Sequence, residues 1–482
     1  MEPFSDLALV DGERVGAVSG ATLDVINPAT NDVIGRIPRC DERDVEVAVA
    51  AAKRAAPGWR STEPQMRAAA LLAFAETIAE RGEELARLDS VDNGSPLHEM
   101  RNDIGLATSQ IRYLAGLALE VRGRTMPETP GRLHYTVHEP FGVTARIIAF
   151  NHPLMFAATK IAAPLLAGNA VILKPSELTS LSALAMGDDL QRLFPPGVVQ
   201  ILTGLGAEVG DALVRHPGIP RIAFIGSAAT GRRIQASAAS SSVKTVTLEL
   251  GGKNPIVVFP DADLDLAVEG AIRGMNFTWQ GQSCGSTSRL LVHQDRYADF
   301  VARVGERIAG MRAGPPLDPE SDLGAIVTPQ QLDKVLSYIE IGKAEQARLV
   351  TGGERLREGP LAAGNFVSPA LFADVDPAGR LATEEIFGPV LAAIPFADYD
   401  EAVSIANSVE YGLTASAFTR DLRTAIAFSR DVEAGYVWIN ETARHFIGAP
   451  FGGVKNSGVG REEDLAEIES YTQTKSVNMR FD

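Results

Sequence analysis

From about residue 140 the chain alternates short apolar runs with helical segments, and this rhythm limits its possible folds more than any other feature. Each run is apolar on both faces and ends in a turn containing Gly, Pro or Asn. Such strands, alternating with helices, predict an α/β fold with a parallel sheet covered on both sides. The expected strands of this first unit are 143–150, 170–173, 198–202, 221–225 and 245–248, with helices through 160–166 and from about 180. Before the first unit, residues 41–56 and 64–90 are expected to form amphipathic helices.

The rhythm resumes after residue 252, which indicates a second α/β unit of similar size. This unit is expected to contain strands at 256–259, 288–292 and 417–419, and helices over 262–280 and 295–311. Ligands usually bind in the cleft between two such units.

Two segments, 122–141 and 467–482, lie outside this rhythm and alternate charged with apolar residues. They are expected to be exposed strands. Because an open strand edge needs covering, another subunit is the expected partner.

The charge and cysteine content exclude several classes of protein. The sequence has 45 basic and 61 acidic residues, and its net charge of −16 disfavours nucleic acid and anionic membranes as main partners. No uninterrupted apolar run is long enough for a membrane span, and the N-terminus lacks a signal-peptide pattern. The two cysteines, Cys40 and Cys284, cannot build a disulfide framework or a cysteine-rich zinc site. We therefore expect a soluble enzyme or binding protein of the cytoplasm, without a metal.

Two turns at the ends of strands in the first unit could bind a nucleotide. Gly226 and Ser227 join a strand to a helix, where free backbone N–H groups and the helix dipole favour phosphate. Lys174 and Glu177 follow another strand, and a carboxylate there can accept both hydroxyls of an adenosine ribose. Taken singly, each could be an ordinary turn, but both are expected at the carboxyl edge of one sheet.

Cys284 lies in a turn of small residues before a strand, where we expect it to be exposed. A thiolate adds readily to a carbonyl carbon and forms a reactive thioester. It needs activation, which a nearby positive charge or a helix dipole would supply. The alternative is an inert thiol, as we expect for Cys40.

Glu249 and Asn151 also end strands and offer acid–base and hydrogen-bonding chemistry. Leucines flank Glu249, and an apolar setting would raise its pKa and make it a usable general base. The Asn151 amide could donate to an oxyanion. The alternatives are a salt-bridged acid at the strand end and a turn-forming asparagine before His152 and Pro153.

These residues occur within short motifs whose order and spacing resemble the NAD(P)-dependent aldehyde dehydrogenase superfamily over essentially the whole chain. Each motif alone is weak, but their common order is specific. The motifs are Asn151, KPSE at 174–177, FIGS at 224–227, ELGG at 249–252, GQSC at 281–284, EIFGP at 385–389, PFGG at 450–453 and SGVGRE at 457–462.

The resemblance implies an aldehyde dehydrogenase-like fold of two doubly wound parallel-sheet domains and a small β oligomerisation arm. It assigns residues 1–121 and 142–251 to an NAD-binding domain, 252–451 to a catalytic domain, and 122–141 with 467–482 to the arm. It further implies a homodimer or homotetramer that acts on a small-molecule aldehyde.

The resemblance also implies an oxidation in two steps. Cys284 attacks the aldehyde, Asn151 and the Cys284 backbone N–H hold the oxyanion, and hydride passes to the nicotinamide. Glu249 then activates water to hydrolyse the thioester, while Lys160 and Glu462 match a proton relay. The cofactor is NAD, with NADP possible, and the matching residues are Lys174 and Glu177 (adenosine ribose), Gly226 and Ser227 (pyrophosphate), Glu385 (nicotinamide ribose) and Phe387 beside it.

Two positions depart from the family pattern. Ile225 stands where threonine is commoner, and His152 stands where an aromatic or apolar residue is usual. The retained Glu177 favours NAD, because a carboxylate repels the 2′-phosphate of NADP.

The resemblance leaves the aldehyde open. Arg444 or His445 could pair with a carboxylate, making the substrate a carboxylated semialdehyde or aromatic aldehyde, or Arg444 could face solvent or a neighbouring subunit. The other substrate class is an uncharged aromatic aldehyde packed against Phe156 and Trp279. Alternative activities are a CoA-acylating dehydrogenase, which Glu249 argues against, and a cysteine-dependent esterase without a redox role. The residues that match the family's substrate pocket are Met155, Phe156, Thr159, Trp279, Ser283, Arg444, His445 and Phe451.

Overall fold

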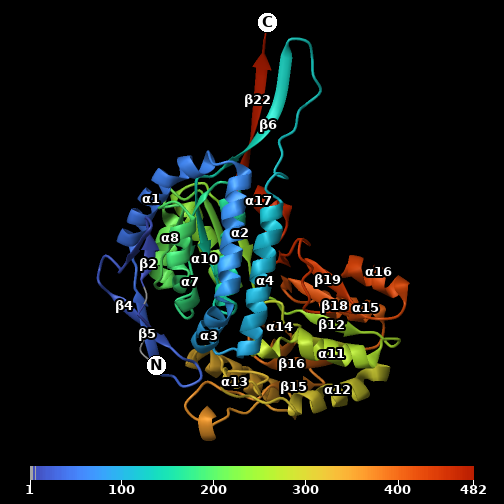
Figure 1. The fold of residues 1–482 in the computed structure, drawn as a ribbon. Coiled ribbons are helices and arrows are strands. Elements are labelled where there is room, and N and C mark those ends of the chain that lie inside the picture. Colours follow the sequence, from blue (N-terminus) through green and yellow to red (C-terminus); the bar gives the residue numbers. More distant parts are fainter. Residues whose placement is uncertain (1–3, 6, 482) are drawn as a thin grey trace.

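The computed structural model describes residues 4–5 and 7–481, which form two α/β bodies and a projecting β ribbon (Figure 1). An eight-stranded sheet organises the N-terminal body, and its five central strands, β11-β10-β7-β8-β9, run parallel. The α/β class and the parallel order expected from the apolar runs are confirmed. The strands are β2 (Ala8–Val10), β3 (Glu13–Val15), β7 (Val143–Ile147), β8 (Ala170–Lys174), β9 (Val199–Ile201), β10 (Arg221–Ile225), β11 (Thr245–Glu249) and β21 (Gly458–Val459).

Helices cover both faces of this sheet because its strands are apolar on both sides. In β8, Val171 and Leu173 pack toward α2 and α4–α8, while Ala170 and Ile172 pack toward α1, α9 and α10. In the described part of the chain, no helix combines the length and the apolar character that a membrane span requires. The helices are α1 (Glu42–Arg60), α2 (Pro64–Glu80), α3 (Gly82–Asn93), α4 (Leu97–Gly116), α5 (Pro153–Thr159), α6 (Ala162–Leu166), α7 (Leu181–Ala185), α8 (Gly187–Leu193), α9 (Asp211–Arg215) and α10 (Ala228–Ser241).

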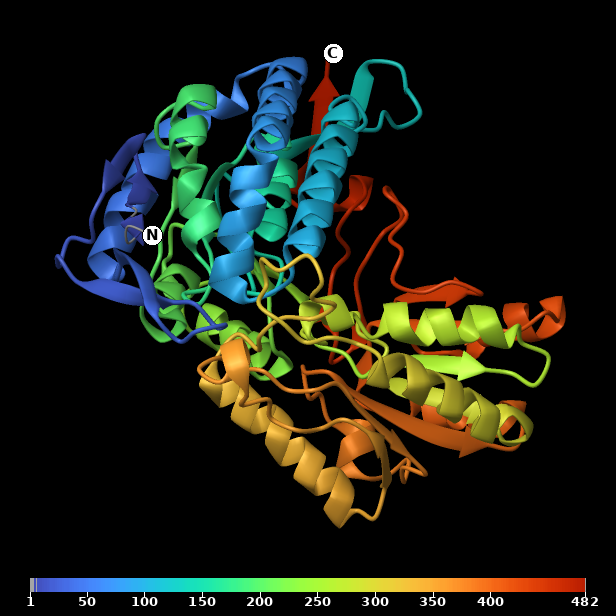
Figure 2. The same ribbon diagram turned by 60° about the horizontal axis from the view of Figure 1, so that its bottom comes forward.

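A seven-stranded sheet organises the second body, which lies beside the first in Figure 2, coloured yellow-green to red. Its neighbouring strands are parallel except for β14 and β15. Ile256 and Val258 pack toward α11 and α12, and Val257 packs toward α13–α16. The elements are β12 (Pro255–Val258), β13 (Arg289–His293), β14 (Arg348–Thr351), β15 (Ala370–Ala373), β16 (Val390–Phe396), β18 (Thr414–Phe418), β19 (Tyr436–Ile439), α11 (Leu264–Gly274), α12 (Gln294–Ala309), α13 (Pro329–Ala344), α14 (Arg380–Thr383), α15 (Tyr399–Asn407) and α16 (Leu422–Asp431).

The ribbon consists of β6 (Arg132–Pro140) and β22 (Thr472–Arg480), which pair antiparallel along their whole lengths and project from the body (Figure 1). None of their residues is fully buried. The expected strands are confirmed over β6 and β22, whose residues are half-buried or exposed. Residues 122–131 make only isolated bridges, and helix α17 (Leu465–Glu469) extends into the second segment. The other strands form two small sheets, β1 (Phe4–Ser5), β5 (Val33–Pro38) and β4 (Thr22–Ile26) in one, and β17 (Tyr411–Gly412) and β20 (Val454–Lys455) in the other.

Three helices that the periodicity predicts as single runs are interrupted. The helix expected from about 180 breaks at Met186, between α7 and α8. The expected helix over 64–90 breaks at Arg81, between α2 and α3. The expected helix through 160–166 breaks at Lys160, between α5 and α6. The breaks at Arg81 and Lys160 each carry a cation whose side chain pairs with a carboxylate from another part of the chain. Local sequence also favours these breaks, because Gly82 follows Arg81 and Pro164 cannot donate a hydrogen bond to the Lys160 carbonyl.

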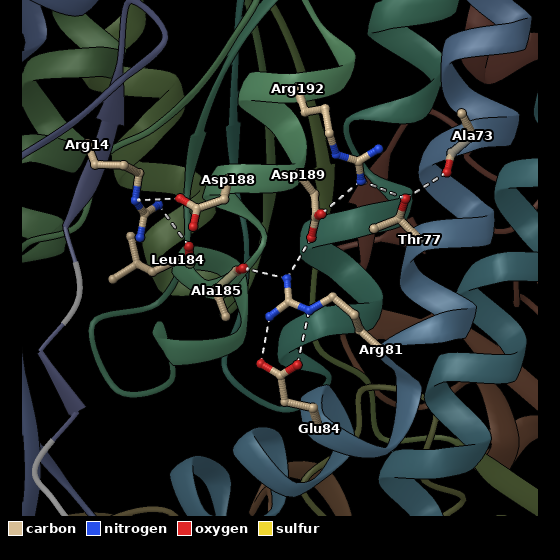
Figure 3. Close-up of polar contacts among 10 residues, drawn as sticks. All are labelled: Arg14, Ala73, Thr77, Arg81, Glu84, Leu184, Ala185, Asp188, Asp189 and Arg192. Atoms are coloured by element: carbon tan, nitrogen blue, oxygen red, sulfur yellow. Dashed lines mark hydrogen bonds and ion pairs between the residues drawn. The ribbon is translucent and has the colours of Figure 1, made fainter.

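Arg81 ties the junction of α2 and α3 to α7 and α8 (Figure 3). Its guanidinium donates to the Ala185 carbonyl (2.9 Å) and to Asp189 (2.6 Å), and it pairs with Glu84 through two nitrogens. Arg192 also donates to Asp189 (3.1 Å). One mostly buried carboxylate thus joins two arginines from different helices.

We expect Arg81→Ala to lower the free energy of unfolding by about 2 kcal/mol, because the Ala185 carbonyl and the Asp189 carboxylate both lose a charged donor. Urea unfolding measures this loss. The matched control is Glu84→Gln, which disturbs only the exposed pair of the same arginine and should cost less than about 1 kcal/mol. Equal losses in the two variants would show that the contacts to α7 and α8 add nothing.

Candidate active site

The segment that leads to the candidate nucleophile is not the long helix expected over 262–280. Helix α11 ends at Gly274, and the chain then makes the 3₁₀ turn η2 (Phe277–Trp279). Asn276 and Gln280 flank this turn in left-handed conformations, with φ of 54°. Asparagine tolerates this conformation better than most residues. The apolar periodicity of the segment does not reveal these two residues, which end the helix.

Cys284 is held in a half-buried turn. Asn254 donates from Nδ2 to the carbonyls of Cys284 (2.8 Å) and Ser286 (3.0 Å). Burial, together with the negative charges of Glu249 and Glu385, raises the pKa of the thiol to about 12. The expected exposure is therefore wrong, since the thiol is half-buried, and the charged groups that act on it are carboxyl groups instead of the cation or helix dipole that could have activated it. At neutral pH this thiol is protonated and needs a base.

Glu249 supplies a carboxyl group near that thiol. It is buried at the end of β11, and neither carboxyl oxygen has a hydrogen-bond partner among the described residues. Burial first, and then the charge of Glu462, raises its pKa well above the ordinary value. Gly452 permits this packing, because a Cβ there would lie 2.8 Å from Oε1 of Glu249. The apolar setting predicted from the flanking leucines leaves a carboxyl group suited to accept a proton.

A buried ion cluster adds its charges to those around Glu249. Lys160 Nζ lies 2.8 Å from one oxygen of Glu462, and Arg146 lies 2.6 Å from the other and also donates to the Tyr471 hydroxyl (3.0 Å). Burial opposes the ionisation of Glu462, but the two cations outweigh it and lower its pKa. Sequence reasoning missed Arg146. Its signal is a charge inside an otherwise apolar strand, which needs a buried acid as partner.

Glu463 and His445 extend this cluster toward the surface. Oε1 of Glu463 lies 3.9 Å from Lys160 Nζ, and Oε2 lies 3.2 Å from His445 Nδ1. Burial opposes the ionisation of Glu463, but the contact with His445 outweighs it and lowers the pKa. His445 thus has a carboxylate of the chain itself as its partner. Sequence reasoning missed Glu463, although it directly follows the motif residue Glu462.

Lys174 and Glu177 meet at the carboxyl end of β8. Lys174 is buried, and its ammonium group donates to Glu177 (2.8 Å) and to the Pro175 carbonyl (3.1 Å). Burial opposes the ionisation of Glu177, but Lys174 and the backbone N–H of Gly206 outweigh it and lower the pKa. The carboxylate is ionised and partly exposed, so it can accept hydrogen bonds from a ligand.

The turn between β10 and α10 presents the N-terminus of a helix. Gly226 donates its backbone N–H to the Glu249 carbonyl (3.0 Å), which ties this turn to the end of β11. Ser227 caps α10 by accepting a hydrogen bond from the Thr230 N–H (3.3 Å). Other N–H groups of a first helical turn have no intrahelical partner, and this makes the turn a suitable phosphate site.

Glu385 crosses from the second body toward the first. It accepts a hydrogen bond from the Gly252 N–H (3.0 Å), and its carboxylate lies so close to Gly251 that any Cβ there would clash. The Phe387 ring packs edge-to-face on Phe150 with centroids 5.6 Å apart. Residues from both bodies therefore meet at the edge where Cys284 and Glu249 lie.

Helix α5 and the turn η2 bring together several residues expected at the substrate. Met155, Phe156 and Thr159 are buried on α5. The His152 ring lies 5.2 Å from the Phe156 ring and 4.9 Å from the Trp279 ring, between centroids. The unusual histidine at the start of α5 therefore contacts two of the predicted aromatic walls.

Arg444 lies apart from those residues. It is exposed and lines a surface hollow of about 550 Å³. The Phe451 ring packs on the His445 ring, with centroids 4.6 Å apart. Ser283 is half-buried and directly precedes the nucleophile Cys284. The hollow contains no other predicted site residue, since its remaining lining is Gly435, Tyr436, Val437, Trp438, Glu441, Phe446 and Ala449.

Comparisons with known proteins agree over nearly the full length. Residues 15–477 match the model of the aldehyde dehydrogenase family. The chain is 44% identical to aldehyde dehydrogenase tropH of Talaromyces stipitatus, over 98% of this chain and 92% of that protein. PnpE of Pseudomonas sp. WBC-3, solved with nicotinamide adenine dinucleotide, has a TM-score of 0.97 at 39% identity, over 99% of this chain and 98% of that one. The indole-3-acetaldehyde dehydrogenase AldA of P. syringae, solved as a mutant with NAD⁺ and IAA, has a TM-score of 0.96 at 35% identity, over 100% of this chain and 97% of that one.

Proposed function

The chain belongs to the aldehyde dehydrogenase family and uses NAD(P) as its cofactor, and on this premise we propose that it oxidises an aldehyde to the carboxylic acid through a covalent bond to Cys284. The observation that carries the proposal is the buried, unpaired Glu249 carboxyl group, whose charge acts on the Cys284 thiol. The pair supplies a nucleophile and a base in one site. The base favours water over CoA as the acyl acceptor, and the nucleotide-binding edge would have no use in an esterase.

The carboxyl edge of the first sheet fits a dinucleotide. Glu177, ionised and held by Lys174, suits ribose hydroxyls, and the turn at Gly226 and Ser227 suits the pyrophosphate. Glu385 would hold the nicotinamide ribose. When bound, the oxidised nicotinamide supplies a hydride acceptor. The carboxylate at the adenosine ribose should favour NAD, because it repels the 2′-phosphate of NADP.

Groups of the chain itself can carry the proton and bond changes of both steps. As the Cys284 sulfur bonds to the aldehyde carbon, Glu249 takes the thiol proton, and the Asn151 amide and the Cys284 N–H donate to the oxyanion. Asn93 fixes this backbone, because its side chain donates to the Asn151 carbonyl (3.1 Å). Once oxidation leaves a thioester, Glu249 takes a proton from water. The water oxygen then bonds to the thioester carbon, and the C–S bond breaks.

The remaining family roles are part of the same proposal. Lys160 and Glu462 would relay protons from Glu249. The sheet of β7–β11 would bind the cofactor, with residues 252–451 as the catalytic domain. The β6–β22 ribbon would join protomers into a homodimer or homotetramer in the cytoplasm.

Of the two substrate classes, we propose the aromatic aldehyde. Phe156 and Trp279 supply ring surfaces near the start of α5, where both contact the His152 ring. The P. syringae relative is named for indole-3-acetaldehyde, an aldehyde that carries an aromatic ring. A carboxylated semialdehyde would need Arg444 or His445 at the substrate, but Arg444 is exposed on a surface hollow and His445 already pairs with Glu463.

Initial rates of NADH formation across paired aldehydes, each with and without a distal carboxylate, test this proposal. We expect neutral aromatic members to react fastest and NAD to be preferred over NADP. Arg444→Ala should change the ratio of kcat/KM between paired members less than about twofold, because an exposed guanidinium away from the substrate contributes little. A loss confined to carboxylated members would establish that class instead. Absence of NADH with every aldehyde would refute the oxidation.

A further inference from the structure

We propose that Glu463 and His445 form the outlet through which protons leave the active site for solvent. The inference rests on the proposed function, in which one aldehyde, one water and the oxidised cofactor give a carboxylate, the reduced cofactor and two protons. These protons arise near Cys284 and Glu249, and the Glu249 carboxyl has no hydrogen-bond partner among the described residues. A route to the surface is therefore required at each turnover.

The side chains become steadily more exposed along the proposed route. Lys160 and Glu462 are 5% and 6% exposed, Glu463 is 10% exposed, and His445 is 26% exposed. The intervening distances are 2.8 Å from Glu462 to Lys160, 3.9 Å from Lys160 to Glu463, and 3.2 Å from Glu463 to His445. Carboxylates alternate with nitrogen groups along this line, with hydrogen-bond distances at its two ends and the 3.9 Å step from Lys160 to Glu463 between them.

Protons have no route to solvent on the opposite side of the cluster, next to Arg146. Arg146 is fully buried, and a guanidinium does not give up its proton in a protein. Its other partner, the Tyr471 hydroxyl, is buried too. Protons that reach Lys160 therefore have no outlet in that direction.

A small cavity lies where the route turns outward. Its volume of about 10 Å³ is at the lower limit for one water, and Lys160, Glu463 and Glu467 are among the residues that line it. Glu467 accepts the Glu463 N–H (2.8 Å), and burial together with the Glu462 charge raises its pKa to about 7. It can hold a proton near neutrality beside the route. The titratable or charged groups that face the route are Glu249, Glu462, Glu467, Arg146, Arg461, Tyr471 and His445.

Each transfer conserves protons and needs no further reactant. The Glu249 carboxyl passes its proton to the Lys160–Glu462 pair, Lys160 passes one to Glu463, and Glu463 passes one to Nδ1 of His445. Histidine takes up and releases protons near neutral pH, which suits it to the solvent end.

Stopped-flow measurement with a pH-indicator dye in weak buffer tests the outlet, because it records proton release and NADH formation together. In the wild type the two should coincide. In His445→Gln and Glu463→Gln, release should lag NADH formation by about tenfold, less than the loss of a direct general base. Added imidazole should restore the rate of His445→Gln, with KM for aldehyde and NAD unchanged. His216→Gln is the matched control, since His216 pairs with Glu46 (3.2 Å) on another part of the first body.

Synchronous proton release in both variants would overturn the outlet, as would a deficit of His445→Gln that imidazole does not reduce. A KM change confined to carboxylated aldehydes would also overturn it, because it would place His445 at the substrate. Failure of the proposed function looks different. In that case the wild type itself forms no NADH with any aldehyde, and both proposals fall together.

Discussion

Cys284→Ala should abolish aldehyde oxidation while NAD still binds. Without the sulfur no covalent bond to the aldehyde carbon forms, and loss of a nucleophile typically lowers kcat by roughly 10⁴-fold or more. The proposed nucleotide contacts lie outside the Cys284 turn, since Glu177 is in the turn after β8 and Ser227 caps the N-terminus of α10. Steady-state NADH formation measures the loss, and calorimetric titration with NAD should give a Kd within about twofold of the wild type.

The chain contains its own control for that experiment. Cys40 is also buried, and burial raises the pKa of its thiol to about 12 as well. The two carboxylates that act on this second thiol, Asp44 and Asp41, form the capping box of α1, so neither is free as Glu249 is to serve as its base. Cys40→Ala should therefore retain oxidation. Activity in Cys284→Ala, or its loss in Cys40→Ala, would contradict the assignment.

Glu249→Gln should form about one equivalent of NADH per site and then stall. Acylation loses Glu249 as the base for the thiol, so the burst should be slower than in the wild type. It can still occur, because removing the Glu249 charge lowers the pKa of the neighbouring Cys284 thiol, whose proton then passes to solvent. Hydrolysis loses its base, and steady-state turnover should fall by about 10²–10⁴-fold. Stopped-flow absorbance measures the burst, and intact-mass spectrometry should find the acyl group on the protein. Normal turnover would mean that another group activates water.

The same substitution should stabilise the protein in a pH-dependent way. The folded state keeps Glu249 protonated to a higher pH than the unfolded chain does, because burial raises its pKa. Wild-type stability therefore falls as pH rises from about 4.5 through the folded-state pKa, since only the unfolded chain has released this proton. Glutamine removes that cost. The gain in melting temperature should be larger at pH 8 than at pH 5.5, and an equal gain at both would contradict the raised pKa.

The sheets were predictable because their signal is local. Each buried strand is an unbroken apolar run, and β10, for example, spans the predicted residues 221–225 without shift. The apolar period does not reveal the helix breaks, because Arg81 and Lys160 both fit it. Gly82 weakens the first helix, and Pro164 cannot donate to the Lys160 carbonyl in the second. Distant partners, Asp189 and Glu462, then hold the two cations at the breaks.

At the candidate site, too, properties with a local sequence signal were predictable and those that depend on distant residues were not. The leucines beside Glu249 predict its burial, and a raised pKa follows from burial. The small residues around Cys284 predict an open turn, but its electrostatic setting depends on Glu385, which is remote in sequence. The pairing of His445 with Glu463 is equally non-local, and it turns a predicted substrate contact into part of a buried charge cluster.

The length of helix α5 fixes the distance between two proposed parts of the site. Its seven residues separate Asn151, where the oxyanion is proposed to form, from Lys160, where protons are proposed to collect. At 1.5 Å per residue the helix is a strut of about 10 Å, and inserting one residue would turn Lys160 by about 100° away from Glu462. An insertion in an exposed loop would leave this distance unchanged, whereas the length of α5 fixes the distance between the proposed oxyanion site and the proposed proton-collecting site.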